Sequence, residues 1–343
     1  MEILPTLWFT LISVLWIGYL FLEGFDLGVG MHILFSTRDE KKKRVMLNSI
    51  GPVWDGNEVW LITAAGAMFA AFPFWYASLF SALYIPLVVV LLGLIFRAVA
   101  IEYRGKGTSV RWRRGWDLAL GLGSLITAFG IGAALALTTT GLPLDENGDR
   151  VGGAWAWFSG YAVVGGLAVV GFCLVHAAVF LALKTDGEVR TSARRFVSLS
   201  LPIGLLPMTG WVVAVQLNTG SAVTWTLAVI AVTGAAWAWT ANRHGREGWS
   251  FVALGTFLVA GASAIFAAVY PVLLPSTLDS SFDLTVSNAA SSDYTLGVMT
   301  VVACLGIPLV LAYQGWTYWV FRKRVSVAHI PEAHPIVAAV RKP

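Results

Sequence analysis

Charge is scarce in this sequence of 343 residues. Asp, Glu, Lys and Arg make up 12% of the chain, whereas a typical soluble domain carries about 25%. Apolar residues reach 57%, and so few charges cannot cover the surface of a soluble protein. The composition therefore excludes a cytosolic globular enzyme, a disordered chain and a secreted disulfide-rich domain.

Cysteine and histidine are also rare. Cys173 and Cys304 lie within long apolar runs, so we expect small membrane-buried residues and no structural disulfide. Walker, HExxH and CxxC motifs are absent, and Gly28-Val-Gly30 is no dinucleotide-binding fingerprint because no strand precedes it. Of the five histidines, His32 and His176 fall in expected helices. Each could ligate a haem axially, although a lone histidine in an apolar helix is more often a packing residue.

Long apolar runs fill most of the chain. A membrane-spanning helix needs about 20 apolar residues, and the runs of this length are 7–34, 52–72, 74–101, 116–138, 154–183, 196–217, 222–241, 249–270 and 295–321. We therefore expect an all-α, polytopic integral membrane protein with nine transmembrane helices. The first run has no basic segment before it, so it should be a retained helix and no cleaved signal peptide.

One membrane domain, 1–343, accommodates all these runs. Helices one to four fall in 1–138, helices five to eight in 154–270, helix nine in 295–321 and a cytoplasmic tail in 322–343. This arrangement predicts two four-helix bundles plus one further helix.

The basic residues give an orientation, because cytoplasmic loops carry an excess of Lys and Arg. Of the 23 basic residues, 21 lie in alternate loops and the tail, within 38–44, 104–114, 184–195, 243–246 and 322–342. The exceptions are Arg97 and Arg150. We therefore expect the N-terminus outside and the C-terminus in the cytoplasm. The positive surplus reports topology, so we expect no nucleic-acid partner.

Two carboxylates lie in the first expected helix. An ionisable side chain within a span costs at least about 2.5–3.5 kcal/mol, so Glu23 and Asp26 need an explanation. Their spacing places both on one face. Gly24 and Gly28, roughly opposite, form a small-xxx-small pair that lets another helix approach closely. Helix one should therefore contact protein on both faces, and its carboxylates could conduct protons or only satisfy inter-helix hydrogen bonds.

The next two expected helices carry further charge. Asp55 and Glu58 are three residues apart near the cytoplasmic start of helix two, with Asn57 between them. Asp55 could be a first-turn acid favoured by the helix dipole. Arg97 either extends to the membrane interface or pairs with a carboxylate of helix one or two. Glu102 follows at the end of helix three.

All these acids share one side of the membrane. The cytoplasmic half or its boundary holds Glu23, Asp26, Asp55, Glu58, Glu102 and also Asp117, which we expect to be a boundary acid at the start of helix four. A one-sided set indicates protons that enter from the cytoplasm and stop part way. A proton-coupled secondary transporter acting alone is the alternative, but alternating access would need polar groups at the midplane and on both sides. A structural scaffold whose acids only pack is a third possibility.

Several motifs occur along the chain. They are Gly24-Phe-Asp-Leu-Gly-Val-Gly30, Gly51-Pro-Val-Trp-Asp-Gly-Asn-Glu-Val-Trp60, Phe69-Ala-Ala-Phe-Pro73, Phe96-Arg97 with Glu102-Tyr-Arg104, Trp112-x-x-x-Trp116-Asp117, Asn288–Met299 and Tyr313-x-x-Trp316. With nine expected spans, this set resembles subunit II of cytochrome bd-type quinol oxidases. The resemblance spans the chain and is densest over 18–117.

The resemblance implies a subunit of a terminal oxidase in the bacterial cell membrane, which oxidises quinol, reduces dioxygen to water and generates proton-motive force. Two b-type haems and one d-type haem would be carried by the partner, subunit I, and this chain would bind no cofactor or metal and hold no catalytic residue. Small single-span accessory subunits could accompany the pair. Subunit II would support assembly and supply part of the cytoplasmic proton route.

Individual residues follow from the same resemblance. Asp55 and Glu102 match carboxylates of the proton route, and Glu102 stands where Asp also occurs in the family. Glu58 stands where some members have Gln, and Val53 stands where some carry His.

The remaining candidates extend or support this route. Glu23 and Asp26 would extend it within helix one. Asn57 and Arg97 would be supporting residues. Trp60 would lie beside a hydrophobic dioxygen path toward the d-type haem of the partner.

Overall fold

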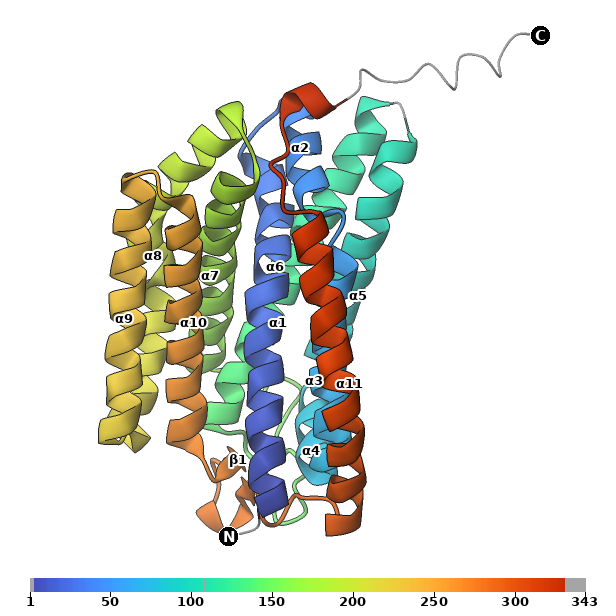
Figure 1. Ribbon diagram of the computed structural model, residues 1–343. Coiled ribbons are helices and arrows are strands. Elements are labelled where there is room, and N and C mark those ends of the chain that lie inside the picture. The colour runs from blue at the N-terminus through green and yellow to red at the C-terminus, as the bar shows by residue number, and fades with distance from the viewer. Residues whose placement is uncertain (1–2, 108, 331–343) are drawn as a thin grey trace, which may run out of the picture.

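The computed structural model describes residues 3–107 and 109–330, and its long elements are all helices (Figure 1). In chain order the elements are α1 (Ile3–Phe35), α2 (Glu40–Ile50), α3 (Trp54–Ala71), α4 (Pro73–Ala82), α5 (Tyr84–Tyr103), η1 (Arg104–Lys106), α6 (Val110–Thr140), α7 (Gly160–Lys184), α8 (Gly187–Thr219), α9 (Ala222–Arg243), α10 (Glu247–Val269), β1 (Val272–Leu274), η2 (Ser280–Phe282), β2 (Leu284–Thr285), α11 (Asp293–Val320) and η3 (Val327–His329). β1 and β2 form a small antiparallel hairpin.

Eight helices among the described residues are long and apolar enough to cross a membrane, namely α1, α5 with η1, and α6 to α11. They correspond to eight of the nine expected runs. The remaining run, 52–72, is helical as α3, but Asp55, Asn57 and Glu58 make its first two turns polar. Of the expected tail, 322–330 is described, whereas Arg341 and Lys342 lie outside the described residues.

The run 74–101, which we expected to be one helix, is divided. α4 ends at Ala82 and α5 begins at Tyr84, with Leu83 between them. Pro86 has no N–H to donate to the carbonyl of Ala82, four residues earlier, and a proline in that place disfavours a continuous helix. The prediction of an unbroken third helix is therefore wrong, because it weighed hydropathy above this local constraint.

The segment after α1 also differs from expectation. Residues 36–48 were expected to be a loop, but α2 occupies most of that segment. The Asp39 side chain caps it by accepting from the Lys41 N–H, and Val45, Met46 and Ile50 are buried on one face. This is an amphipathic helix, and its short apolar face lies within a charged run that resembles a loop.

A charged cluster attaches α2 to the ends of α5 and α6. Arg104 places Nε 2.5 Å from Asp117 Oδ1 and Nη1 2.8 Å from Glu40 Oε1. Lys43 Nζ lies 2.8 Å from the other oxygen of Asp117. α6 begins at Val110, so Asp117 lies about two turns inside the helix. Its interpretation as a boundary acid at a helix start is wrong, since it holds an ion-pair network together.

α1 lies at the centre of the molecule. It packs against α3, α6 and α7, and Figure 1 shows α7 to α10 on one side of it and α3 to α5 with α11 on the other. A Cβ at Gly28 would collide with the backbone oxygen of Cys173, and one at Gly24 would lie 3.2 Å from the Phe172 ring. The glycines therefore face α7, which confirms the expected close helix approach.

α11 is the least buried of the long helices. Leu296 is its one buried residue. After α11 the chain turns back, and the Val325 N–H donates to Lys184 O while Asp186 N–H donates to Val325 O. Ile330 is buried in the same cluster as the apolar face of α2. The segment 322–330 thus connects α11 to the turn between α7 and α8.

Candidate functional site

Arg97 on α5 joins two of the expected carboxylates. Its side chain is fully buried. Its Nη2 lies 2.5 Å from Glu23 Oε1 on α1, and its Nη1 donates to Glu58 Oε2 on α3 at 3.2 Å. Of the two interpretations of Arg97, extension to the membrane interface is wrong and pairing with helices one and two is correct.

Asp26 belongs to a second branch of the cluster. Its Oδ2 accepts a 2.7 Å hydrogen bond from the Asn57 side-chain amide, which also donates to Leu22 O. Asp26 is fully buried, and its Oδ1 has no hydrogen-bond partner among the described residues. Asn57 therefore holds one oxygen of this carboxylate, and the carboxyl of Glu23 on the same helix is close enough to interact with it.

α11 extends the network to the other side of Asn57. The Tyr318 hydroxyl donates to Asn57 Oδ1 at 2.8 Å, and Gln314 Nε2 donates to the same oxygen at 3.2 Å. Trp60 Nε1 donates in turn to Gln314 Oε1 at 2.9 Å. Because both donors point at the amide oxygen, the amide nitrogen of Asn57 must point toward Asp26. α11 thus determines the orientation of the group that donates to the buried carboxylate.

The cluster has more acid than base. Glu23, Asp26 and Glu58 surround a single cation, Arg97. If all three carboxylates were ionised, two negative charges would lack a compensating cation in a low-dielectric interior, which is strongly unfavourable. Like charges in a shared site favour retention of a proton. The arrangement is therefore chemically suited to take up and release protons.

Asp55 and Glu102 lie apart from this cluster. Both are exposed, Asp55 in the first turn of α3 and Glu102 near the end of α5. Neither forms a hydrogen bond or ion pair with another described residue, although Asp55 influences Glu58 one turn away electrostatically. The position of Asp55 also fits the simpler interpretation of a first-turn acid at a helix N-terminus.

The buried histidines serve packing. His176 Nε2 bonds to Phe21 O at 2.8 Å, and His32 Nε2 bonds to Leu174 O at 2.9 Å. Among the described residues no group of three His, Cys, Asp or Glu side chains could hold a metal ion. Cys173 and Cys304 are both free. Both rings also pack against aromatic side chains, His176 on Phe172 and His32 on Phe196, which fits the packing interpretation.

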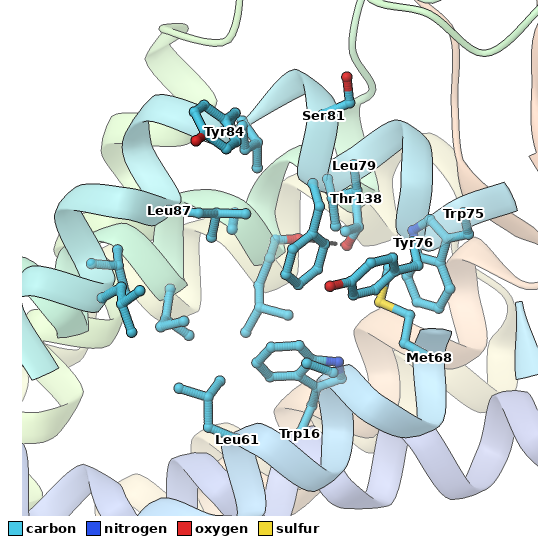
Figure 2. A pocket seen from close by; sticks show the side chains of 18 of the residues that line it. Trp16, Leu61, Met68, Trp75, Tyr76, Leu79, Ser81, Tyr84, Leu87 and Thr138 are labelled. Carbon is cyan, nitrogen blue, oxygen red and sulfur yellow. Dashed lines mark hydrogen bonds between the residues drawn. The ribbon is translucent and has the colours of Figure 1, made fainter. Parts of the chain in front are cut away.

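An apolar cavity of about 660 Å³ lies among α1, α3, α4, α5 and α6, and Phe266 of α10 also lines it. Trp16 and Leu61 lie across the cavity from Leu87 (Figure 2). Trp60 does not line it, but its chain neighbour Leu61 does. The Trp60 ring lies against Gly18, where a Cβ would collide with it. The expected gas-path role of Trp60 stays a prediction.

Sequence reasoning missed the contribution of α11. Gln314 and Tyr318 are four residues apart, so they share one face of the helix. Gln314 is an uncharged polar residue in an otherwise apolar run, and a polar side chain in a span often hydrogen-bonds to another helix. Gln314 therefore indicates a hydrogen bond to another helix, but the sequence does not show which residue is its partner.

The fold and the site define a class: a polytopic α-helical membrane protein with a buried, carboxylate-rich cluster. The family "Cytochrome bd terminal oxidase subunit II" matches residues 4–321. The chain belongs to this family, as its motifs indicated, and it is a multi-pass membrane protein.

Individual relatives agree. The chain is 39% identical to cytochrome bd ubiquinol oxidase subunit 2 of Bacillus subtilis, with 95% of this chain and 98% of the relative covered. It is 31% identical to cytochrome bd-I ubiquinol oxidase subunit 2 of Escherichia coli K12, with 95% and 96% covered. A chain in the structure of bd oxidase from Geobacillus thermodenitrificans has the same fold, with a TM-score of 0.77 at 18% identity over 93% of this chain and 99% of that one.

Proposed function

We propose that this chain works as the haem-free second subunit of a quinol:dioxygen oxidoreductase, in which it supports assembly and delivers cytoplasmic protons to its partner. The observation that carries the proposal is the carboxylate set on α1, α3 and α5, where Asp55 and Glu102 are exposed and Glu23, Asp26 and Glu58 are buried or half-buried. Surface acids can collect protons, and a buried cluster with excess acid can hold them.

The proposed route runs inward along α3. Asp55 receives a proton at the surface, and Glu58 lies one turn deeper. Arg97 links Glu58 to Glu23, and Asp26 is one turn from Glu23 on α1. Glu102 serves as a second surface acid near the cytoplasmic end of α5.

The proposed partner is subunit I. It packs against the exposed apolar side of this chain that α5 and α11 form. Subunit I would hold two b-type haems and one d-type haem, which would supply the electron-transfer and dioxygen chemistry. Quinol releases its protons outside while water formation draws protons from inside, which separates charge.

We propose a topology of nine spans with the N-terminus outside, in which α3 crosses the membrane together with the eight longer apolar helices. Two four-helix bundles then lie beside α11, which is the ninth span. Trp60 and the adjoining apolar cavity form the proposed dioxygen path.

The direct test is Asp55→Asn, which keeps the size of the side chain and removes its titratable group. We expect quinol oxidase turnover to fall about tenfold or more, because a positioned acid or base typically contributes at least 10²-fold to a proton-transfer step. The measurement is oxygen consumption per haem in the purified complex. Haem content and the amount of partner should equal those of the unchanged protein.

Two results would separate the alternatives. Asp55→Asn combined with Glu102→Gln should reduce turnover further, whereas full activity of the assembled double variant would support a scaffold. Purification of a colourless chain that moves a solute across vesicles by itself would support a proton-coupled transporter. Asp39→Asn is a matched control, since Asp39 is a cytoplasmic cap of α2 outside the proposed route.

Tyr318→Phe tests the role of α11. The change removes the hydroxyl that donates to Asn57 Oδ1 and leaves the ring in place. One neutral hydrogen bond contributes about 0.5–1.5 kcal/mol, so we expect a two- to tenfold loss of turnover and a shifted pH profile. Tyr313→Phe is the control, because Tyr313 is exposed on the same helix. Equal behaviour of the two variants would exclude an orienting role for Tyr318.

A further inference from the structure

Two hollows flank the turn between α9 and α10. The first, about 500 Å³, is lined by Trp237, Thr240, Ala241, His244, Arg246 and Trp249. The second, about 560 Å³, is lined by Arg246, Glu247, Gly248, Trp249 and Val252. Arg246 and Trp249 line both, so the two hollows adjoin at these residues. Figure 1 shows this turn at the same end of the molecule as α2.

The neighbouring arginines are already engaged. Glu247 is buried and lies 2.7 Å from Arg190, 3.6 Å from Arg194 and 3.7 Å from Arg324. Arg243 lies over the Trp239 ring at 4.8 Å. Arg190, Arg194, Arg324 and Arg243 thus each have a partner within the protein.

Arg246 and His244 are different. Their side chains are exposed and form no hydrogen bond or ion pair with other described residues. Both line the first hollow. A guanidinium beside an imidazole is suited to a phosphate group, to which charge-assisted hydrogen bonds are strong.

Two exposed tryptophans at this turn are typical of a membrane boundary. The Trp237 and Trp249 rings are 5.5 Å apart at an interplanar angle of 31°, and they are 45% and 55% exposed. Tryptophan is enriched where lipid headgroups meet acyl chains. Val252, three residues after Trp249 on α10, also lines the second hollow.

We propose that the α9–α10 turn binds one anionic phospholipid of the cytoplasmic leaflet. Arg246 and His244 bind the phosphate, and the two acyl chains occupy the two hollows. The adjoining hollows beside two exposed tryptophans favour a diacyl lipid over free phosphate, which has no apolar part to place there. The choice of leaflet rests on the orientation stated under the proposed function.

The test uses the purified complex in phosphatidylcholine vesicles that contain a trace of phosphatidylglycerol with a photoactivatable acyl chain. Crosslinked peptides are located by mass spectrometry. We expect labelling of 237–252 to exceed that by the matching phosphatidylcholine probe. It should fall about tenfold in the double variant Arg246→Gln with His244→Gln, the loss expected when charged hydrogen bonds worth about 1.4 kcal/mol or more disappear.

Arg243→Gln is the control and should keep its labelling, since Arg243 lies on Trp239. Unlabelled phosphatidylglycerol should compete with the probe, and inorganic phosphate should not. Equal labelling by both probes, no change in the double variant, or equal competition by inorganic phosphate would each overturn the proposal. Turnover is measured on the same samples, so loss of the lipid site and failure of the proton-delivery proposal give separate results.

Discussion

Arg97→Gln is expected to destabilise the protein by about 3–5 kcal/mol, the typical cost of removing one partner of a buried ion pair. The substitution would leave Glu23 without its cation and would deprive Glu58 of its donor. Because Arg97 joins α5 to α1 and α3, we expect less assembled complex in the membrane as well. The measurement is the thermal unfolding temperature and the yield of haem-containing complex.

Two further variants show whether the loss of stability comes from the buried ion pair. Arg111→Gln is the matched control, because Arg111 is exposed near the start of α6 and should change stability little. Arg97→Gln combined with Glu23→Gln should recover part of the loss, since no uncompensated charge then remains at that contact. If the single Arg97 variant unfolds at the same temperature as the Arg111 variant, the buried ion pair does not stabilise this fold.

Gly28→Val is expected to disrupt the contact between α1 and α7. A Cβ at position 28 would collide with the backbone oxygen of Cys173 and with Ala177, and backbone cannot move aside as a flexible side chain can. Overpacking of this kind costs about 1–3 kcal/mol or more. The unfolding temperature and the yield of full-length chain check the effect.

Gly66→Val is the control for this change. Gly66 lies on α3, where an added Cβ would meet nothing within 4 Å, so the same gain in side-chain size creates no collision. Both substitutions also place the same β-branched residue inside a helix, so their effect on helix propensity is matched. If the two variants are equally stable, close approach at Gly28 is unimportant.

The sequence predicted helices better than helix ends. Apolar runs locate eight spans because hydrophobic length is a local property. The division at Leu83 depends on where the carbonyl partner of Pro86 lies, and the helix at Glu40–Ile50 depends on burial of three residues by the rest of the fold. Average hydropathy records neither effect.

The site was predicted in part. Spacing identified faces of single helices, and it placed Glu23 with Asp26 and Asp55 with Glu58. It could not show which neighbour each face meets. Asp55 and Glu58 lie three residues apart on α3, yet of these two only Glu58 contacts Arg97. The pairing depends on how α1, α3 and α5 cross, and that geometry follows from packing of the whole bundle.

We propose that protons reach the oxidase through the carboxylates of this chain. This proposal is tested most directly in vesicles that hold the purified complex in a known orientation, with a pH indicator on the cytoplasmic side and a pulse of dioxygen. Asp55→Asn with Glu102→Gln should slow proton uptake from that side in parallel with turnover, at unchanged haem content. A fully assembled double variant that takes up protons at the rate of the unchanged protein would contradict the account.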